Sequence, residues 1–183
     1  MKNVSTWIQH LIPITCATAL LFSSACSTEE LPDVSTTPTA ALQIKIPSLE
    51  DELARLTQKM QRFHNFKVAQ AQGFEPVSPY VPHMGIHFGK LDRFDAAFIL
   101  EEPELLLYVP DGKGGMRFVG VEYAVPVALA PTPPEGFTGD TDHWEYNPHV
   151  AGGSWVLHAW IIEENPDGVF APMNMNIPAT PAN

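Results

Sequence analysis

Histidine and glutamate are the side chains in this sequence whose types and spacing could do chemistry. His83 and His87 stand four residues apart, and His143, His149 and His158 follow in the last third of the chain. The neutral imidazole nitrogen is a common ligand of zinc and iron, and carboxylates complete many such sites. These two histidine clusters are therefore the first candidates for a metal-binding site.

The first cluster depends on the local backbone. Four residues apart on a helix, His83 and His87 would be neighbours and could share an ion. On an extended strand they would be ~13 Å apart, which is too far for a common ion. Pro82 and Gly85 disfavour a helix here. Both histidines can therefore ligate one metal only if the chain bends between them.

Glu122 and His158 lie within predicted strands. Alternation along the strand puts Glu122 on the same face as Phe118 and Ala124, so a solvated strand residue and a buried carboxylate stay open as interpretations. His158 shares a face with Trp160 in an aromatic, β-branched segment. It is either a hydrogen-bonded core histidine or a ligand.

A long helix is predicted before the histidines. Ser48 and Asp51 fit a capping box, and Gly73 is a plausible stop, which gives about six turns. An apolar stripe recurs at helical spacing, formed by Leu49, Leu53, Leu56, Met60 and Phe63. The stripe faces either the protein's own sheet or a second subunit, so a homo-oligomer stays open.

Strands and turns are predicted after the helix. Glu104–Val109 and Met116–Val125 flank a turn rich in Asp and Gly and predict a β-hairpin, and Ser154–Ile162 predicts a further strand. Asn165–Gly168 reads as a type I turn. The expected fold class is α+β, with an N-terminal amphipathic helix packed on an antiparallel β-sheet or a small open β-barrel.

The first residues predict export. Lys2, an apolar stretch and small residues before Cys26 form a signal peptide. Ser24-Ala25-Cys26 resembles the end of a bacterial lipobox, which implies lipidation of Cys26 and anchoring to a bacterial cell membrane on its periplasmic or cell-surface side. An ordinary secretory signal cut near Ala25 is the alternative. Cys16 lies inside the signal, so Cys26 has no disulfide partner after cleavage.

Composition sets the expected domain layout. The 183 residues are 45% hydrophobic and 17% charged, which predicts a packed core. The net charge of −11 would repel phosphate backbones, so we expect no nucleic-acid partner. The layout is a lipoprotein signal peptide over 1–25, a flexible tether over 26–46, a single globular domain over 47–176 and a loose tail over 177–183.

Several short motifs occur in a fixed order over roughly residues 55–176. They are His64-Asn65-Phe66-Lys67, Met84-Gly85-Ile86-His87-Phe88, Pro103-Glu104-Leu105-Leu106-Leu107-Tyr108, Gly120-Val121-Glu122-Tyr123, Leu157-His158-Ala159-Trp160 and Asn165-Pro166-Asp167-Gly168-Val169-Phe170. In this order they resemble a family of exported bacterial proteins that share Met-Gly-x-His-aromatic, Glu-Tyr, Leu-His-x-Trp and Asn-Pro-x-Gly-x-Phe motifs. No activity is established for that family.

The resemblance ranks the candidate ligands. His87, Glu122 and His158 match recurring positions of the family, whereas His83 and His149 are weaker candidates. Many members of the family carry a histidine where this chain has Ser154, with His149 nearby, so this chain lacks the fourth ligand that the resemblance would imply at that position.

Two histidines and one carboxylate suit zinc with an open position, or non-haem iron. Tyr123 or Trp160 would shield such a site. The expected function is an exported, metal-binding lipoprotein. The alternatives are a binding or assembly module without metal, in which these residues form a buried hydrogen-bond network, and a metal-dependent hydrolase or oxygenase. The sequence identifies no small-molecule ligand.

Overall fold

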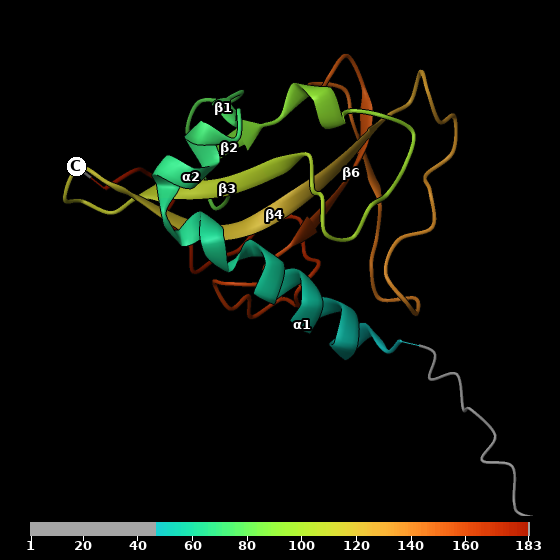
Figure 1. Cartoon of the computed structure of the whole chain (residues 1–183), viewed down its shortest axis with the longest axis horizontal. Helices are drawn as coiled ribbons and strands as arrows, with labels where there is room; N and C mark the ends of the chain where they lie inside the picture. Colours follow the sequence, from blue (N-terminus) through green and yellow to red (C-terminus); the bar gives the residue numbers. More distant parts are fainter. Residues whose placement is uncertain (1–46, 183) are drawn as a thin grey trace, which may run out of the picture. The chain divides into compact units, whose positions relative to one another are not determined.

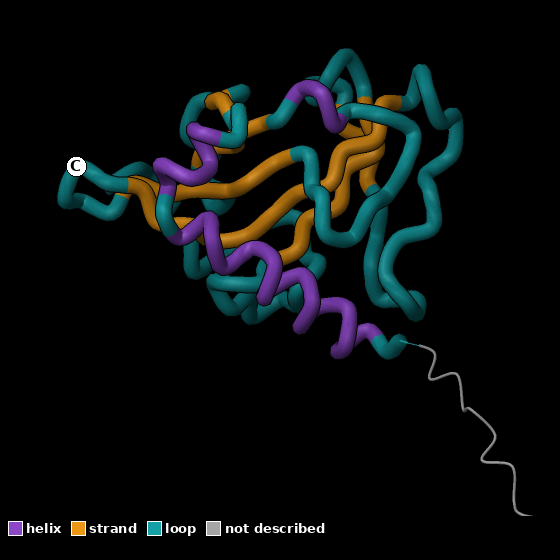
Figure 2. The backbone as a smooth tube through the Cα atoms, viewed as in Figure 1, coloured by secondary structure: helices purple, strands orange, loops and turns teal. Residues whose placement is uncertain are grey.

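The computed structural model describes residues 47–182, and these residues form an α+β fold. Short helices lie across one face of an open antiparallel sheet (Figures 1 and 2). The expected signal peptide, Cys26 and the tether lie outside the described residues. Within 47–182, no helix is long and apolar enough to cross a membrane.

The helical segment begins as predicted and ends differently. Helix α1 (Leu49–Met60) starts at Ser48, whose hydroxyl accepts from the Asp51 N–H while the Asp51 carboxylate accepts from the Ser48 N–H, so the capping box is confirmed. A 3₁₀ turn (Gln61–His64) and a second helix, α2 (Phe66–Ala71), follow.

The expected helix of six unbroken turns is therefore wrong. Asn65 is extended and its side-chain oxygen caps the Lys67 N–H, which starts α2 as a new helix. Gly73 does end the segment, with φ +84°, and the Phe74 N–H donates to the Ala69 carbonyl as in a Schellman motif.

The sheet has six strands in the order β1-β2-β3-β4-β6-β5, and every neighbouring pair is antiparallel. The strands are β1 (Glu75–Pro76), β2 (Ile86–Gly89), β3 (Leu105–Pro110), β4 (Met116–Pro126), β5 (Glu145–Asn147) and β6 (Ser154–Ala159). The predicted hairpin is confirmed as β3–β4. The predicted strand to Ile162 stops at Ala159, because the Trp160 N–H donates to the Val169 carbonyl at 2.9 Å instead of to a neighbouring strand.

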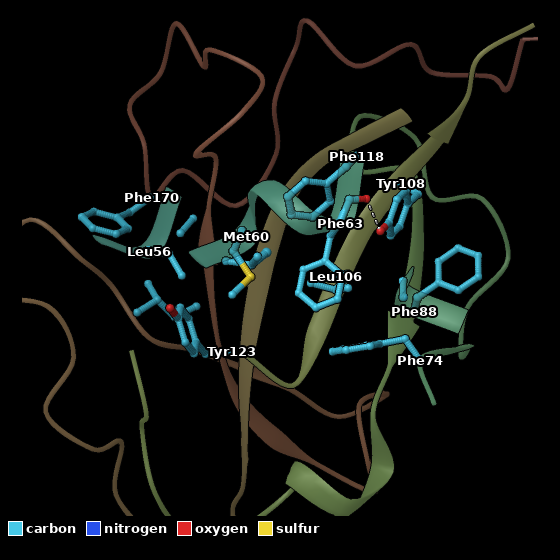
Figure 3. Close-up of a cluster of buried hydrophobic side chains, with 14 of the residues drawn as sticks. Leu56, Met60, Phe63, Phe74, Phe88, Leu106, Tyr108, Phe118, Tyr123 and Phe170 are labelled. Atoms are coloured by element: carbon cyan, nitrogen blue, oxygen red, sulfur yellow. Dashed lines mark hydrogen bonds between the residues drawn. The ribbon is translucent and has the colours of Figure 1, made fainter. Parts of the chain in front are cut away.

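The main core lies between the helices and the sheet (Figure 3). We call this side of the sheet the helix-facing side. Its fully buried members include Leu56, Met60, Phe63, Leu106, Tyr108, Phe118, Val121 and Tyr123. The helical stripe thus packs on the protein's own sheet, and the Tyr108 hydroxyl donates to the Phe63 carbonyl at 2.8 Å, which links sheet and helix.

A β-bulge in the β3–β4 pairing changes which side chains face the helices. The register shifts between Leu107 and Tyr108, whose partners on β4 are Gly120 and Phe118. One β4 residue is therefore extra at this point, and such a residue reverses the alternation beyond it. Phe118 joins the helix-facing core, whereas Glu122 belongs to the opposite side. The prediction that these two residues share a face is wrong for this reason.

The last described residues are held to the domain. Ile177 is fully buried, and the Tyr80 hydroxyl donates to the Pro178 carbonyl at 2.6 Å. Asn174 is also buried, and its amide donates to the Glu163 and Glu164 carbonyls at 3.1 Å. The first two residues of the expected tail over 177–183 are thus held in place, because the Ile177 side chain is buried and the carbonyls of Ile177 and Pro178 contact His83 and Tyr80.

Candidate metal centre

His87, Glu122 and His158 come together on the side of the sheet opposite the helices. Glu122 on β4 pairs directly with His158 on β6, and His87 reaches toward them from β2 across β3. The distance is 3.4 Å from His87 Nε2 to Glu122 Oε2 and 3.8 Å from His158 Nε2 to Glu122 Oε1. One ligand atom from each of the three residues lies within 4.8 Å of the others.

The three side chains are almost completely removed from solvent. Their exposed fractions are 8% for His87, 1% for Glu122 and 6% for His158. Among the described residues, Glu122 Oε2 and His158 Nε2 have no hydrogen-bond partner, since the 3.4 Å contact from His87 lacks hydrogen-bond geometry. A buried polar atom without a partner costs about 1–3 kcal/mol, so these groups destabilise the fold unless something binds them.

Burial drives all three groups toward their neutral forms. Desolvation lowers the pKa of His87 to about 4 and that of His158 to about 3, with the His87 charge as a second cause for His158. Desolvation, followed by the negative charge of Glu104, raises the pKa of Glu122 to about 8. Both imidazoles are therefore neutral at pH 7, which is the form that ligates metals.

Ser78 orients His87. Its hydroxyl accepts from the His87 backbone N–H at 3.0 Å, donates to the Pro79 carbonyl at 2.8 Å and lies 3.0 Å from His87 Nδ1. A hydroxyl has one hydrogen to donate, and the carbonyl takes it, so we assign the ring proton to Nδ1. The lone pair of Nε2 then points toward Glu122. Ser78 was not among the expected site residues, because nothing local to Val77-Ser78-Pro79 indicates a partner nine residues later.

Trp160 shields the other histidine. Its ring is stacked on His158, with centroids 5.7 Å apart and an interplanar angle of 9°, and its Nε1–H donates to the Ala171 carbonyl. Gly120 makes room for this ring, because a Cβ there would lie 3.2 Å from Trp160 Cε3. Tyr123 faces the helices instead and donates to the Leu100 carbonyl, so of the two expected shields only Trp160 lies at the cluster.

The weaker candidates stand apart from the cluster. His83 has a positive φ of 63°, and its Nδ1 lies 2.9 Å from the Ile177 carbonyl. His149 is exposed and lies at the wall of the adjoining cavity, and it is not part of the cluster of potential ligands. Ser154, the position at which the resemblance implied a fourth ligand, donates its hydroxyl to the Val150 carbonyl. Within residues 47–182, only His87, Glu122 and His158 form such a cluster.

A cavity of about 530 Å³ adjoins the cluster. His87, Glu122 and His158 form part of its lining. The rest comes from the β1–β2 loop, the segment around the 3₁₀ turn Leu91–Arg93, strand β3, the last residue of β5 and the loop after it. These residues are Val77, Ser78, Pro79, Val81, Met84, Leu91, Phe94, Leu105, Asn147, His149, Val150 and Ala151. The size falls in the range of small-molecule sites.

The donor set fits a transition-metal ion. Ligand atoms about 2.0–2.1 Å from a tetrahedral zinc are separated by about 3.3 Å. The contacts of 3.4 and 3.8 Å run from the two histidines to different oxygens of Glu122, and one ligand atom from each of the three residues lies within 4.8 Å of the others. The ligand atoms must therefore draw together by up to about 1.5 Å to close around an ion. Three protein ligands leave at least one position open, on which water or a substrate can bind.

No protein-family model matches the chain, and no match is found among curated proteins or solved structures. The candidate metal centre therefore rests on the residues and geometry of this chain alone.

Proposed function

We propose that this protein binds a divalent transition metal, zinc or ferrous iron, through His87 Nε2, the Glu122 carboxylate and His158 Nε2. One observation carries the proposal: Glu122 Oε2 and His158 Nε2 are buried without a hydrogen-bond partner, within one ligand cluster. A metal ion satisfies both atoms at once. Neutral imidazoles and a carboxylate are the ligands that these two metals accept together.

A module without metal is the competing interpretation, and the unpartnered Glu122 Oε2 and His158 Nε2 atoms argue against it. In a buried hydrogen-bond network every donor and acceptor needs a partner, and a half-satisfied network is worse than an apolar core. Here the contacts between the histidines and Glu122 are 3.4 and 3.8 Å long, beyond or at the limit of a hydrogen bond. A bound cation explains these separations better than a network does.

The test is elemental analysis of the tag-free protein after exposure to zinc or to ferrous iron without oxygen. We expect one metal per chain in the wild type and none in His87→Ala, His158→Ala or Glu122→Gln. His83→Ala is the matched control, because it removes an imidazole from the same loop region without touching the cluster. Circular dichroism establishes that each variant is folded.

Two outcomes would contradict metal binding. One is a folded wild type that takes up neither metal. The other is a set of folded cluster variants that keep the metal as well as His83→Ala does. Cobalt(II) offers a second readout, because its visible absorption is strong only when protein ligands hold the ion. The wild type should show this absorption and Glu122→Gln should not.

A metal-dependent hydrolase or oxygenase is the second candidate function. The observation that favours it is the cavity, which adjoins the cluster where a three-ligand metal keeps an open position. Hydrolysis of activated esters by the zinc form, or oxygen uptake by the ferrous form with candidate substrates, tests it. Activity that survives in Glu122→Gln would show that the catalysis does not come from this site.

We also propose that the protein is exported and held at a bacterial membrane by a lipid on Cys26. The support is the sequence before and at that cysteine. Cys26→Ser should move the protein from the membrane fraction to the soluble fraction. Equal membrane association of both forms would contradict lipid anchoring.

A further inference from the structure

The cavity beside the proposed metal centre is lined mainly by apolar side chains. Its wall is apolar and is made mainly by Val77, Val81, Met84, Leu91, Phe94 and Leu105. In the described part of the chain, neither lysine nor arginine lines it. A ligand with a phosphate, or with several charges, would find no cationic side chain there to balance its charge.

The polar groups of the lining are mostly occupied. The Ser78 hydroxyl is engaged by His87 and Pro79, and the Asn147 side-chain oxygen accepts from the His149 N–H at 2.9 Å. Glu122 and His158 supply the unpartnered buried atoms. A bound molecule can therefore place a polar group at the metal centre, or beside the Asn147 amide nitrogen and the His149 ring at the loop after β5. The rest of the molecule must tolerate an apolar wall.

We propose that this cavity binds a small amphiphilic molecule, with an aliphatic or aromatic body against the wall and one oxygen-bearing head group on the metal. The inference rests on the proposed metal binding and adds the class of ligand. Transfer of each methylene from water to an apolar wall strengthens binding by about fourfold. Polar ligands such as sugars gain nothing from this wall and lose hydrogen bonds to water.

The closing experiment compares two hydroxamic acids that share a metal-binding head and differ in their tails. Every residue of the described core lies between Leu56 and Ile177, so zinc-loaded 44–183 is titrated by calorimetry beside the full chain. We expect octanohydroxamic acid to bind at least about tenfold more tightly than acetohydroxamic acid. Elemental analysis of the same samples gives the zinc content.

A wall variant and a matched control locate the effect. Met84→Gln changes a half-buried wall residue to a polar one of similar length. It should keep the zinc content and the acetohydroxamate affinity and weaken octanohydroxamate binding about fivefold or more. Leu129→Gln, at an exposed position outside the cavity, should change neither affinity.

The outcomes separate this inference from the proposed function. If the protein binds zinc but binds octanohydroxamic and acetohydroxamic acid equally tightly, the proposal of an amphiphilic ligand is wrong and the proposal of a metal site is unaffected. A folded chain that takes up no zinc overturns both. If octanohydroxamate binds the zinc-free protein as tightly as the zinc-loaded protein, the metal does not hold the head group and the inference is wrong. Binding to 44–183 but not to the full chain would mean that a segment of the chain itself occupies the cavity, which also overturns the inference.

Discussion

The two faces of the sheet are built from the same strands but differ in what they bury. On the helix-facing side, aromatic and aliphatic side chains form one continuous core, and the buried hydroxyls of Tyr108 and Tyr123 are both hydrogen-bonded. On the other side, the apolar residues fall into two smaller clusters, and two histidines and a glutamate are buried with unpartnered atoms. The first face provides stability, whereas the second gives up some stability at the proposed metal site.

The largest expected effect comes from the helix-facing core. Phe63→Ala removes a fully buried ring that contacts Phe74 and Phe118, and we expect it to lower the free energy of unfolding by about 3–5 kcal/mol. Urea denaturation of the metal-free protein measures this. Metal content per folded chain should not change. A folded variant that loses its metal would show that the two faces are coupled.

The buried carboxyl of Glu104 gives a pH dependence of known sign. Desolvation raises its pKa from 4.5 to about 7, although the Ala124 N–H and Arg93 oppose the shift. Below pH 4.5 the carboxyl is neutral in both states, so it changes nothing. As pH rises toward 7 the unfolded chain ionises more readily, and the folded state loses about 3 kcal/mol of stability at 1.36 kcal/mol per unit of pKa.

Glu104→Gln removes this contribution together with the effect of the Glu104 charge on the pKa of Glu122, and both changes act in the same direction. The difference in unfolding free energy between the variant and the wild type should grow from pH 4 to pH 8 in favour of the variant. His87 and His158 titrate in the opposite sense, because their pKa values are lowered, but they are present in both proteins and cancel in the difference. A difference that is independent of pH would place the Glu104 carboxyl in water.

Zinc should stabilise the wild-type protein through the face that carries His87, Glu122 and His158. At a free concentration of 100 times Kd, it should raise the unfolding free energy of the wild type by about 2.7 kcal/mol. Glu122→Leu should show no zinc effect, and without metal it should be at least as stable as the wild type, because it removes a buried unpartnered carboxyl oxygen. Strong destabilisation of metal-free Glu122→Leu would contradict the view that this face costs stability.

The smallest expected effect concerns Ser78, which contacts only His87 in the cluster. Ser78→Ala should weaken metal binding about 10–100-fold without abolishing it, because the His87 ring loses the Nδ1 hydrogen bond that orients Nε2. Ser78→Thr keeps the hydroxyl and should restore most of the affinity. Nitrogen NMR of the imidazole provides an independent readout, since the proton assigned to Nδ1 should redistribute only in the alanine variant.

Sequence reasoning succeeded where a feature is set by neighbours along the chain. The Ser48–Asp51 capping box, the β3–β4 hairpin and the stop at Gly73 all depend on residues a few positions apart, and all are confirmed. His87, Glu122 and His158 were ranked by resemblance, and the structure brings them together although 71 residues separate the first from the last.

Other features were decided only by the tertiary structure. Which face Glu122 occupies depends on a bulge in the pairing with β3, and alternation within β4 cannot show an extra residue. Ser78 acquires its role because β2 lies beside the loop that precedes it, and Ile177 is buried because the end of the chain returns to the sheet. The sequence by itself determined the local elements and the types of ligand available. Their burial, their separations and the cavity beside them arise from long-range packing, which no local pattern encodes.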